Sequence, residues 1–113
     1  MTAKNLSGAV DFAYLEGFVA GDIAVVLEVL ALFRQQAEIW AETLDGETEG
    51  WRDVAHTIKG SARGVGAHAL GDAAGRAERG TPADLPAVKA ALDAAVADIA
   101  AYEALKRSQT PNS

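Results

Sequence analysis

Apolar residues recur at steps of three and four along most of the chain, the spacing that places side chains on one face of an α-helix. The longest such run occupies residues 23–44, and its apolar positions are Ile23, Val26, Leu27, Leu30, Phe33, Ala37, Trp40 and Leu44. Asp22 precedes the run, and its carboxylate can accept hydrogen bonds from the free N–H groups of a first helical turn. The pattern predicts a helix from Asp22 to about Thr43.

Shorter helices are predicted on both sides of this run. The first covers residues 10 to 18 or 20 and ends at Gly21, a residue suited to the left-handed conformation at a helix end. The third covers residues 49 to about 63, with Thr48 as its expected N-terminal cap and the glycines at 64 and 66 at its end.

Two more helices complete the pattern. The fourth covers residues 67–79, where Leu70, Ala73, Ala74 and Ala77 form the apolar face. Gly71 and Gly75 lie within it and should let a neighbouring helix approach closely. The last helix follows a turn at residues 80–84 and reaches about Lys106; its inward positions are Leu85, Val88, Leu92, Ala95, Val96, Ile99 and Tyr102.

This element order predicts an all-α domain. Signals for strands are weak, because β-branched runs are short and no Asn-Gly hairpin turn occurs. Four amphipathic helices joined by short connections favour an antiparallel up-down-up-down four-helix bundle, with the short additional N-terminal helix packed on one end or side. We expect the bundle to occupy residues 1–107 and residues 108–113 to form a flexible C-terminal tail.

Composition and charge narrow the classes of function. The chain has 113 residues, a formal net charge of −6 and no cysteine. The negative charge argues against nucleic acid as the main ligand, and the lack of cysteine removes disulfides, zinc–thiolate sites and thiol catalysis. No apolar run is long enough to span a membrane, so we expect a cytoplasmic protein.

The third predicted helix carries the chemistry. Its apolar stripe contains Trp51, Val54, Ala55, Ile58 and Ala62. Arg52, His56, Lys59 and Arg63 form a second stripe about 130° away, so His56 should point outward on a basic ridge. Gly60 follows one turn after His56, where a glycine costs about 0.5–1 kcal/mol relative to alanine. Such a residue leaves room for the backbone of a partner.

An exposed imidazole can act as a nucleophile and hold a phosphoryl group as a phosphoramidate. Lys59, with Arg52 or Arg63, could neutralise the phosphoryl oxygens. The ring also needs an acceptor that orients its other nitrogen. Glu78, on the next helix, is the candidate for that hydrogen bond.

These residues resemble a known family, the histidine-containing phosphotransfer (HPt) domains of multistep phosphorelays. The residues that carry the resemblance are His56, Ile58, Lys59, Gly60, Ser61, Ala62, Gly66, Ala67 and Leu70. The resemblance implies that His56 is phosphorylated, that Lys59 helps to hold the phosphoryl group, and that Gly60 permits close docking of a receiver domain. Glu78 falls where the family places a carboxylate or amide that binds the histidine.

The resemblance also implies partners: response-regulator receiver domains and a hybrid or histidine kinase. The chain would be a phosphocarrier without ATP-dependent kinase activity, and Mg²⁺ would belong to the receiver. We therefore expect no cofactor and no metal on this chain, which should be a monomer. Arg52, Gly60 and Arg63 are the expected docking residues, because a basic ridge suits an acidic receiver pocket.

Two alternatives remain open from the residues. The bundle could dock an acidic protein without covalent chemistry, or it could be a detached phosphoacceptor domain of a histidine kinase. His68 has no supporting neighbours in the sequence and is expected to be solvated or near the rim of the docking surface. Glu78 could pair with Arg76 or Arg79 in place of His56.

Overall fold

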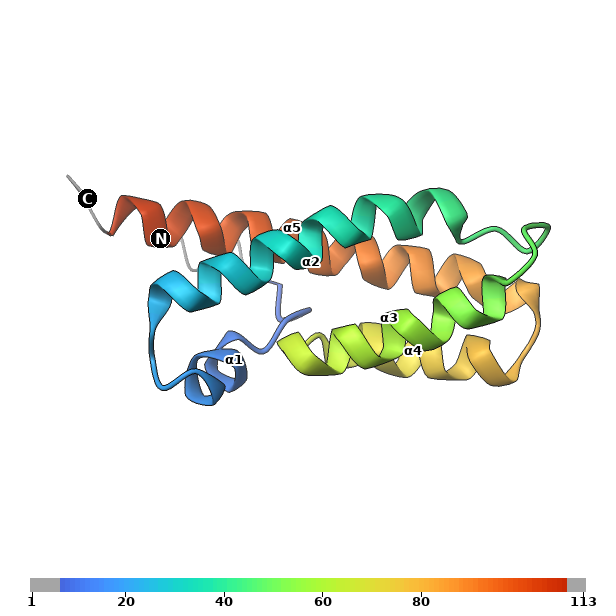
Figure 1. The fold of residues 1–113 in the computed structure, drawn as a ribbon, viewed down its shortest axis with the longest axis horizontal. Coiled ribbons are helices and arrows are strands. Elements are labelled where there is room, and N and C mark those ends of the chain that lie inside the picture. Colours follow the sequence, from blue (N-terminus) through green and yellow to red (C-terminus); the bar gives the residue numbers. More distant parts are fainter. Residues whose placement is uncertain (1–6, 110–113) are drawn as a thin grey trace.

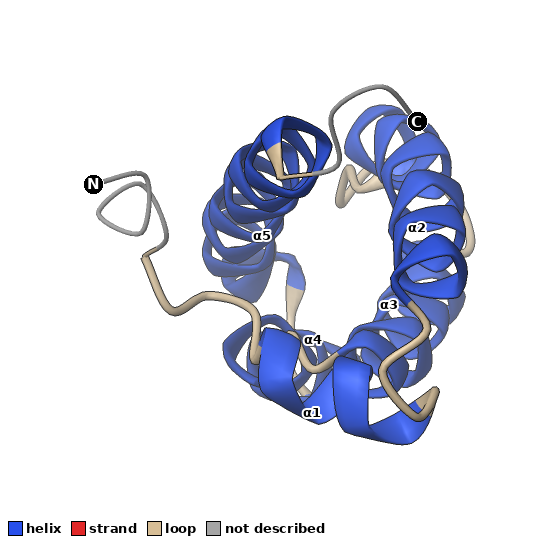
Figure 2. Cartoon of the chain, turned by 90° about the vertical axis from the view of Figure 1, so that its left-hand side faces the viewer, coloured by secondary structure: helices blue, strands red, loops and turns tan. Residues whose placement is uncertain are grey.

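The computed structural model describes residues 7–109 and confirms the predicted fold class. Its elements are α1 (Phe12–Phe18), α2 (Ile23–Thr43), α3 (Trp51–Val65), α4 (His68–Arg79), the 3-10 turn η2 (Pro82–Asp84) and α5 (Leu85–Ser108). Helices α2 to α5 run up and down as an antiparallel bundle, and no strand occurs between residues 7 and 109 (Figure 1). Viewed along the bundle, α3 and α4 form one side and α2 and α5 the other, while α1 lies across one end (Figure 2).

The predicted apolar faces meet in a single core. Nine leucine, isoleucine and valine side chains within it are almost fully enclosed: Leu15, Val26, Leu30, Leu44, Ile58, Leu70, Val88, Leu92 and Ile99. Burial of each such side chain contributes about 1.5–3 kcal/mol to folding. Phe33 and Trp40 are buried as predicted, whereas Trp51 is only partly buried at the edge of the core.

The start of α2 confirms one prediction and the start of α3 corrects another. The Asp22 carboxylate accepts a hydrogen bond from the backbone N–H of Val25. Thr48, however, does not cap α3, because the helix begins two residues later than predicted, after Gly50 in the left-handed conformation (φ 87°). The main chain of Thr48 is used in a turn instead: its carbonyl accepts from the N–H of Trp51.

Gly66 closes the tight connection between α3 and α4. Helix α3 continues to Val65, two residues beyond the predicted end, and Gly66 follows with φ 86°. Its carbonyl accepts from the N–H of Asp11 at 2.8 Å, which ties α1 to this corner. A Cβ on residue 66 would lie 2.7 Å from the carbonyl oxygen of Asp11, so both the conformation and the close approach require glycine.

A buried carboxylate, which the sequence did not predict, fixes the segment before α1. Asp98 on α5 accepts hydrogen bonds from the N–H and hydroxyl of Ser7 at 2.7 and 2.8 Å, and from the N–H of Val10 at 3.3 Å. Burial acts to raise the pKa of Asp98, but these hydrogen bonds outweigh it and lower the pKa. The chain before α1 is thereby held against α5.

Helix α5 continues to Ser108, two residues beyond its predicted end, so residue 108, which was predicted to lie in the tail, is helical. Residues 110–113 lie outside the described part of the chain. None of the helices between residues 7 and 109 combines the length and the apolar character needed to span a membrane.

Candidate functional site

The outer face of α3 presents the predicted basic ridge. Ala55, Ile58 and Ala62 are fully buried on the opposite face of the helix. The side chain of His56 is 65% exposed, in contrast, and Lys59 is 21% exposed. The helical spacing therefore placed His56 correctly, on a surface that a second protein can reach.

Glu78 on α4 binds His56, as predicted. The Glu78 Oε2 atom lies 2.7 Å from Nδ1 of His56, and its Oε1 atom lies 2.8 Å from Nζ of Lys59. Hydrogen bonds from Lys59 and then from His56 hold the pKa of Glu78 below its ordinary value, so this carboxylate is ionised at neutral pH. An ionised carboxylate only accepts hydrogen bonds, so Nδ1 must carry the ring proton. The lone pair of neutral His56 is consequently on Nε2.

The two glycines of α4 lie beneath the side chains of Arg63 and Lys59. A Cβ on Gly75 would lie 3.4 Å from Cδ of Lys59, and one on Gly71 would lie 3.2 Å from Cγ of Arg63. The aliphatic parts of both cationic side chains thus lie directly over α4. The predicted close approach at Gly71 and Gly75 is confirmed.

Gly60 and Gly64 on α3, unlike the glycines of α4, face open space. A Cβ at either position would meet no atom within 4 Å, so nothing inside the bundle requires a glycine there. Both residues are exposed, and they are one helical turn apart. They leave a strip of bare backbone beside His56; Gly64 was predicted only as part of the helix end.

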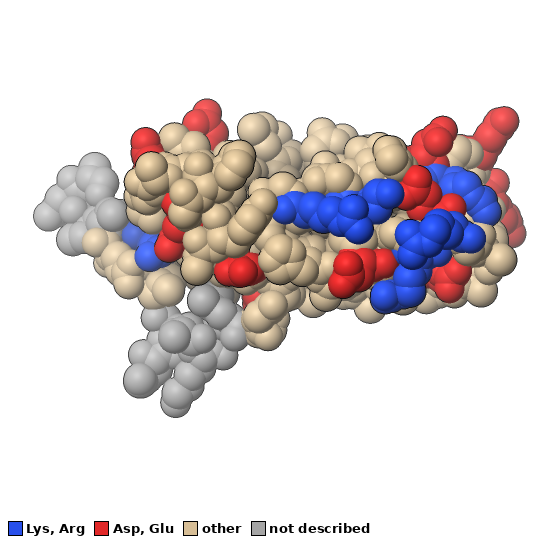
Figure 3. All heavy atoms as spheres, turned by 90° about the horizontal axis from the view of Figure 1, so that it is seen from below, with Lys and Arg blue, Asp and Glu red and all other residues tan. Residues whose placement is uncertain are grey.

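Charge is distributed unevenly around this site. Residues 51–79 carry five Lys or Arg and three Asp or Glu, a net +2, whereas the rest of the chain carries five and thirteen, a net −8. Figure 3 views the molecule from the side of α3 and α4, where the cationic side chains gather with a few acidic ones among them. The site is thus the basic part of an acidic molecule.

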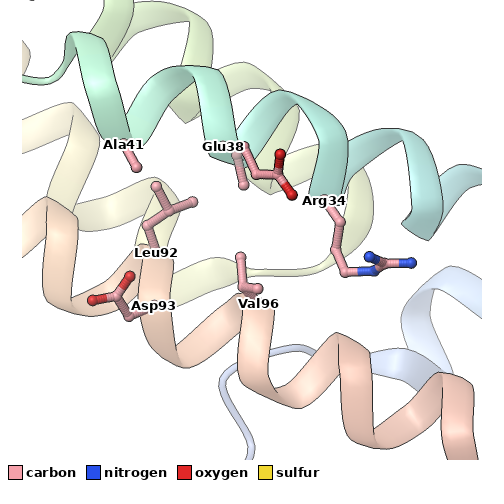
Figure 4. Close-up of a pocket in the computed structure, with 7 residues that line it drawn as sticks. Arg34, Glu38, Ala41, Leu92, Asp93 and Val96 are labelled. Atoms are coloured by element: carbon pink, nitrogen blue, oxygen red, sulfur yellow. The ribbon is translucent and has the colours of Figure 1, made fainter.

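A separate groove lies between α2 and α5. It is lined by Arg34, Glu38, Leu92, Asp93 and Val96, together with two alanines (Figure 4). The Arg34 guanidinium is paired with Glu103 at 2.8 Å. No histidine lines this groove, so it offers no nucleophile comparable to His56. Within residues 7–109, no group of three or more His, Asp or Glu side chains is placed to hold a metal ion.

A family model described as the Hpt domain matches residues 25–102. The chain belongs to the Hpt family. The matched region begins in α2 and ends in α5, and it includes His56, Lys59, Gly60 and Glu78.

A solved Hpt structure agrees with this assignment. The chain is 58% identical to the crystallised histidine phosphotransferase ShpA from Caulobacter crescentus, with a TM-score of 0.81. The alignment covers 91% of this chain and 100% of that one. The comparison with curated proteins finds no match.

The remaining predicted residues of the Hpt site have differing surroundings. Arg63 is exposed and lies along α4 beside Gly71. Arg52 was predicted as a docking residue, yet its guanidinium donates to two main-chain carbonyls at the end of α4. His68, which was not predicted to belong to the site, is exposed, with Nε2 3.7 Å from the Asp11 carboxylate.

Proposed function

We propose that this Hpt protein carries a phosphoryl group on Nε2 of His56 between receiver-domain aspartates of a multistep phosphorelay. The observation that supports it best is the hydrogen bond from Nδ1 of His56 to Glu78, which leaves the lone pair on the exposed nitrogen. An imidazole held in one tautomer is a ready nucleophile for an incoming phosphoryl group.

The transfer step needs few groups from this chain. The Nε2 lone pair attacks the phosphorus of an aspartyl phosphate, the N–P bond forms, and the P–O bond to the departing carboxylate breaks. Nε2 carries no proton, so none has to leave it. The positive charge that develops on the ring is balanced by Glu78. Lys59, whose Nζ lies 2.8 Å from Glu78 in the unphosphorylated protein, stabilises the phosphoryl oxygens.

The receiver would dock over α2 and α3 beside His56. Gly60 and Gly64 supply bare backbone, and an adjoining apolar groove is lined by Val29, Leu32, Phe33, Gln36, Trp40, Ser61, Gly64 and Val65. Leu32 is 58% exposed at this groove, so its apolar side chain is accessible to a partner. This surface fits an apolar patch around a receiver's acidic pocket, and Lys59 and Arg63 of α3 fit the pocket itself.

The groups that this chain lacks would come from its partners. The receiver supplies Mg²⁺ and the phosphoacceptor aspartate, and a hybrid or histidine kinase supplies phosphate upstream. This chain then needs no cofactor or ATP-dependent kinase activity of its own. We place the protein in the cytoplasm, as a monomer.

The direct test is transfer of ³²P from a phosphorylated receiver domain to the protein. We expect an acid-labile, alkali-stable label on the wild type, no label on His56→Gln, and full labelling of His68→Gln. Receiver binding without any label would instead support a docking module. Labelling of His56 with ATP and Mg²⁺ alone would contradict the proposed lack of kinase activity.

A further inference from the structure

The last turn of α4 contains Glu78 and ends without a left-handed C-terminal cap. Helix α4 stops at Arg79, and Gly80 follows with φ −111° and ψ −134°, outside the left-handed conformation by which many helices satisfy their final carbonyls; its N–H donates to the carbonyl of Ala77. Carbonyls in a final turn have no partners within their own helix. The carbonyls of Glu78 and Gly80 are therefore free to accept from a donor on another element.

Arg52 supplies that donor from α3. Its Nε donates to the carbonyl of Glu78 at 3.1 Å, and its Nη2 donates to the carbonyl of Gly80 at 2.7 Å. The guanidinium also lies 4.5 Å from the ring centroid of Trp51, which limits its orientation. A cation at this position is further favoured by the helix dipole of α4.

Three residues of α3 thus bind the same residue of α4. His56 and Lys59 each take one carboxylate oxygen of Glu78, and Arg52 takes its main-chain carbonyl. We infer that Arg52 is a positioning residue: it fixes the end of α4 so that the Glu78 carboxylate meets Nδ1 of His56. Two of its donor nitrogens are already engaged, which argues against its predicted role as a docking cation.

The effect on the ring can be measured without any partner. In mildly alkaline buffer an ordinary imidazole is neutral, and ¹⁵N NMR of labelled histidine reports which ring nitrogen carries the proton. We expect wild-type His56 to be protonated mainly on Nδ1. In Arg52→Gln the population protonated on Nε2 should rise at least twofold, and Arg52→Lys, which keeps the charge but not the planar pair of donors, should fall between them.

Matched variants complete this experiment. Glu78→Ala is the positive control that removes the acceptor, and Lys89→Gln removes an exposed charge on α5. Circular dichroism establishes that each variant keeps its helices. If Glu78→Ala shifts the His56 tautomer but neither Arg52 variant does, the inference is wrong. This readout is independent of phosphotransfer, so its failure and that of the proposed function are distinguishable.

The kinetic readout rests on the proposed function and separates positioning from docking. Arg52→Gln should lower the maximal rate of transfer from a phosphorylated receiver by about tenfold, because a displaced reacting group loses alignment. The receiver concentration at half-maximal rate should stay within about twofold of wild type. A raised half-maximal concentration with an unchanged maximal rate would identify Arg52 as a docking cation and overturn the inference.

Discussion

Glu78 lies on a different helix from His56 and 22 positions later in the sequence, yet its Oε2 atom is 2.7 Å from Nδ1 of the imidazole. The second oxygen of the same carboxylate is 2.8 Å from Nζ of Lys59. One carboxylate therefore binds both the imidazole and the ammonium group beside it. This arrangement places the ring proton on Nδ1 and leaves the lone pair of a neutral ring on Nε2.

Replacement of Glu78 should separate hydrogen bonding from charge. Glu78→Ala removes the acceptor for Nδ1, so we expect transfer from a phosphorylated receiver to slow by about tenfold or more, by analogy with the loss found when the partners that orient metal-binding histidines are removed. Glu78→Gln keeps an oxygen acceptor and should be the milder variant. Quench-flow measurement of His56 phosphorylation checks the order; a Gln variant as slow as the Ala variant would show that the negative charge is what matters.

Gly60 and Gly75 should respond oppositely to substitution. Gly60→Ala adds a methyl group in open space, so the free energy of unfolding should rise by about 0.5–1 kcal/mol. Gly75→Leu places a bulky side chain where a Cβ already lies 3.4 Å from Cδ of Lys59, so it should displace Lys59 and lower stability by about 1–3 kcal/mol.

Urea unfolding of both variants checks this pair. Gly60→Leu, compared with Gly60→Ala, tests docking separately: the larger side chain should weaken receiver binding without destabilising the bundle. Equal receiver affinity for the two variants would contradict a docking role for this face of α3.

The sequence predicted the parts that depend on local patterns. The limits of α2 and its Asp22 cap follow from periodicity and capping chemistry, and the outward direction of His56 follows from helical geometry. Glu78 was found because a nucleophilic ring needs an acceptor on the neighbouring helix. These predictions require only the regular 3.6-residue repeat of each α-helix and the hydrogen-bonding chemistry of single side chains.

The features that the sequence did not predict depend on tertiary placement. The sequence predicts Arg52 only as a docking residue, because its carbonyl partners belong to the end of α4, 26 and 28 positions away. Thr48 was predicted as the cap of α3 because threonine is a favoured residue at helix N-termini. Residue propensities do not reveal that Gly50 adopts the left-handed conformation and that the helix begins after it. Asp98 was missed because its partner Ser7 is 91 positions away.

The buried Asp98 carboxylate should make stability dependent on pH. Its pKa is lowered in the fold, because hydrogen bonds from Ser7 and Val10 outweigh the effect of burial. A carboxyl of lowered pKa stabilises the fold above its unfolded pKa of about 3.9, and the contribution is lost as the pH falls through the folded value. Asp98→Asn should therefore be less stable than wild type by about 1–3 kcal/mol at pH near 7.

Urea unfolding at neutral pH and at about pH 3 measures this difference. The lower pH is chosen because it lies below the ordinary pKa of an aspartate, about 3.9. We expect the gap between wild type and Asp98→Asn to shrink in acid. Asp93→Asn, an exposed change on the same helix, is the matched control. A gap that is constant with pH would show that the Asp98 charge contributes nothing.

Leu32 should contribute to receiver binding and little to stability. Its side chain is 58% exposed and lines the groove beside Gly64 and Ser61. Leu32→Gln should raise the dissociation constant for a receiver by about tenfold, the equivalent of roughly 1.4 kcal/mol. Calorimetric titration checks this, with Ala100→Gln on α5 as the exposed control. If both variants bind like wild type, the receiver docks elsewhere.

The positive net charge of residues 51–79, on a chain that is otherwise strongly negative, should speed encounter with an acidic receiver. Because the Debye length falls from about 10 Å at 0.1 M salt to 3 Å at 1 M, the bimolecular rate of transfer should decline as salt is added. Arg63→Gln and Arg79→Gln should reduce both this rate at low salt and its salt dependence, whereas Lys89→Gln removes the same charge from α5 and should not. Stopped-flow association measured across ionic strength distinguishes these outcomes: equal salt slopes for all three variants would mean that net charge, and not the placement of cations around His56, governs the encounter.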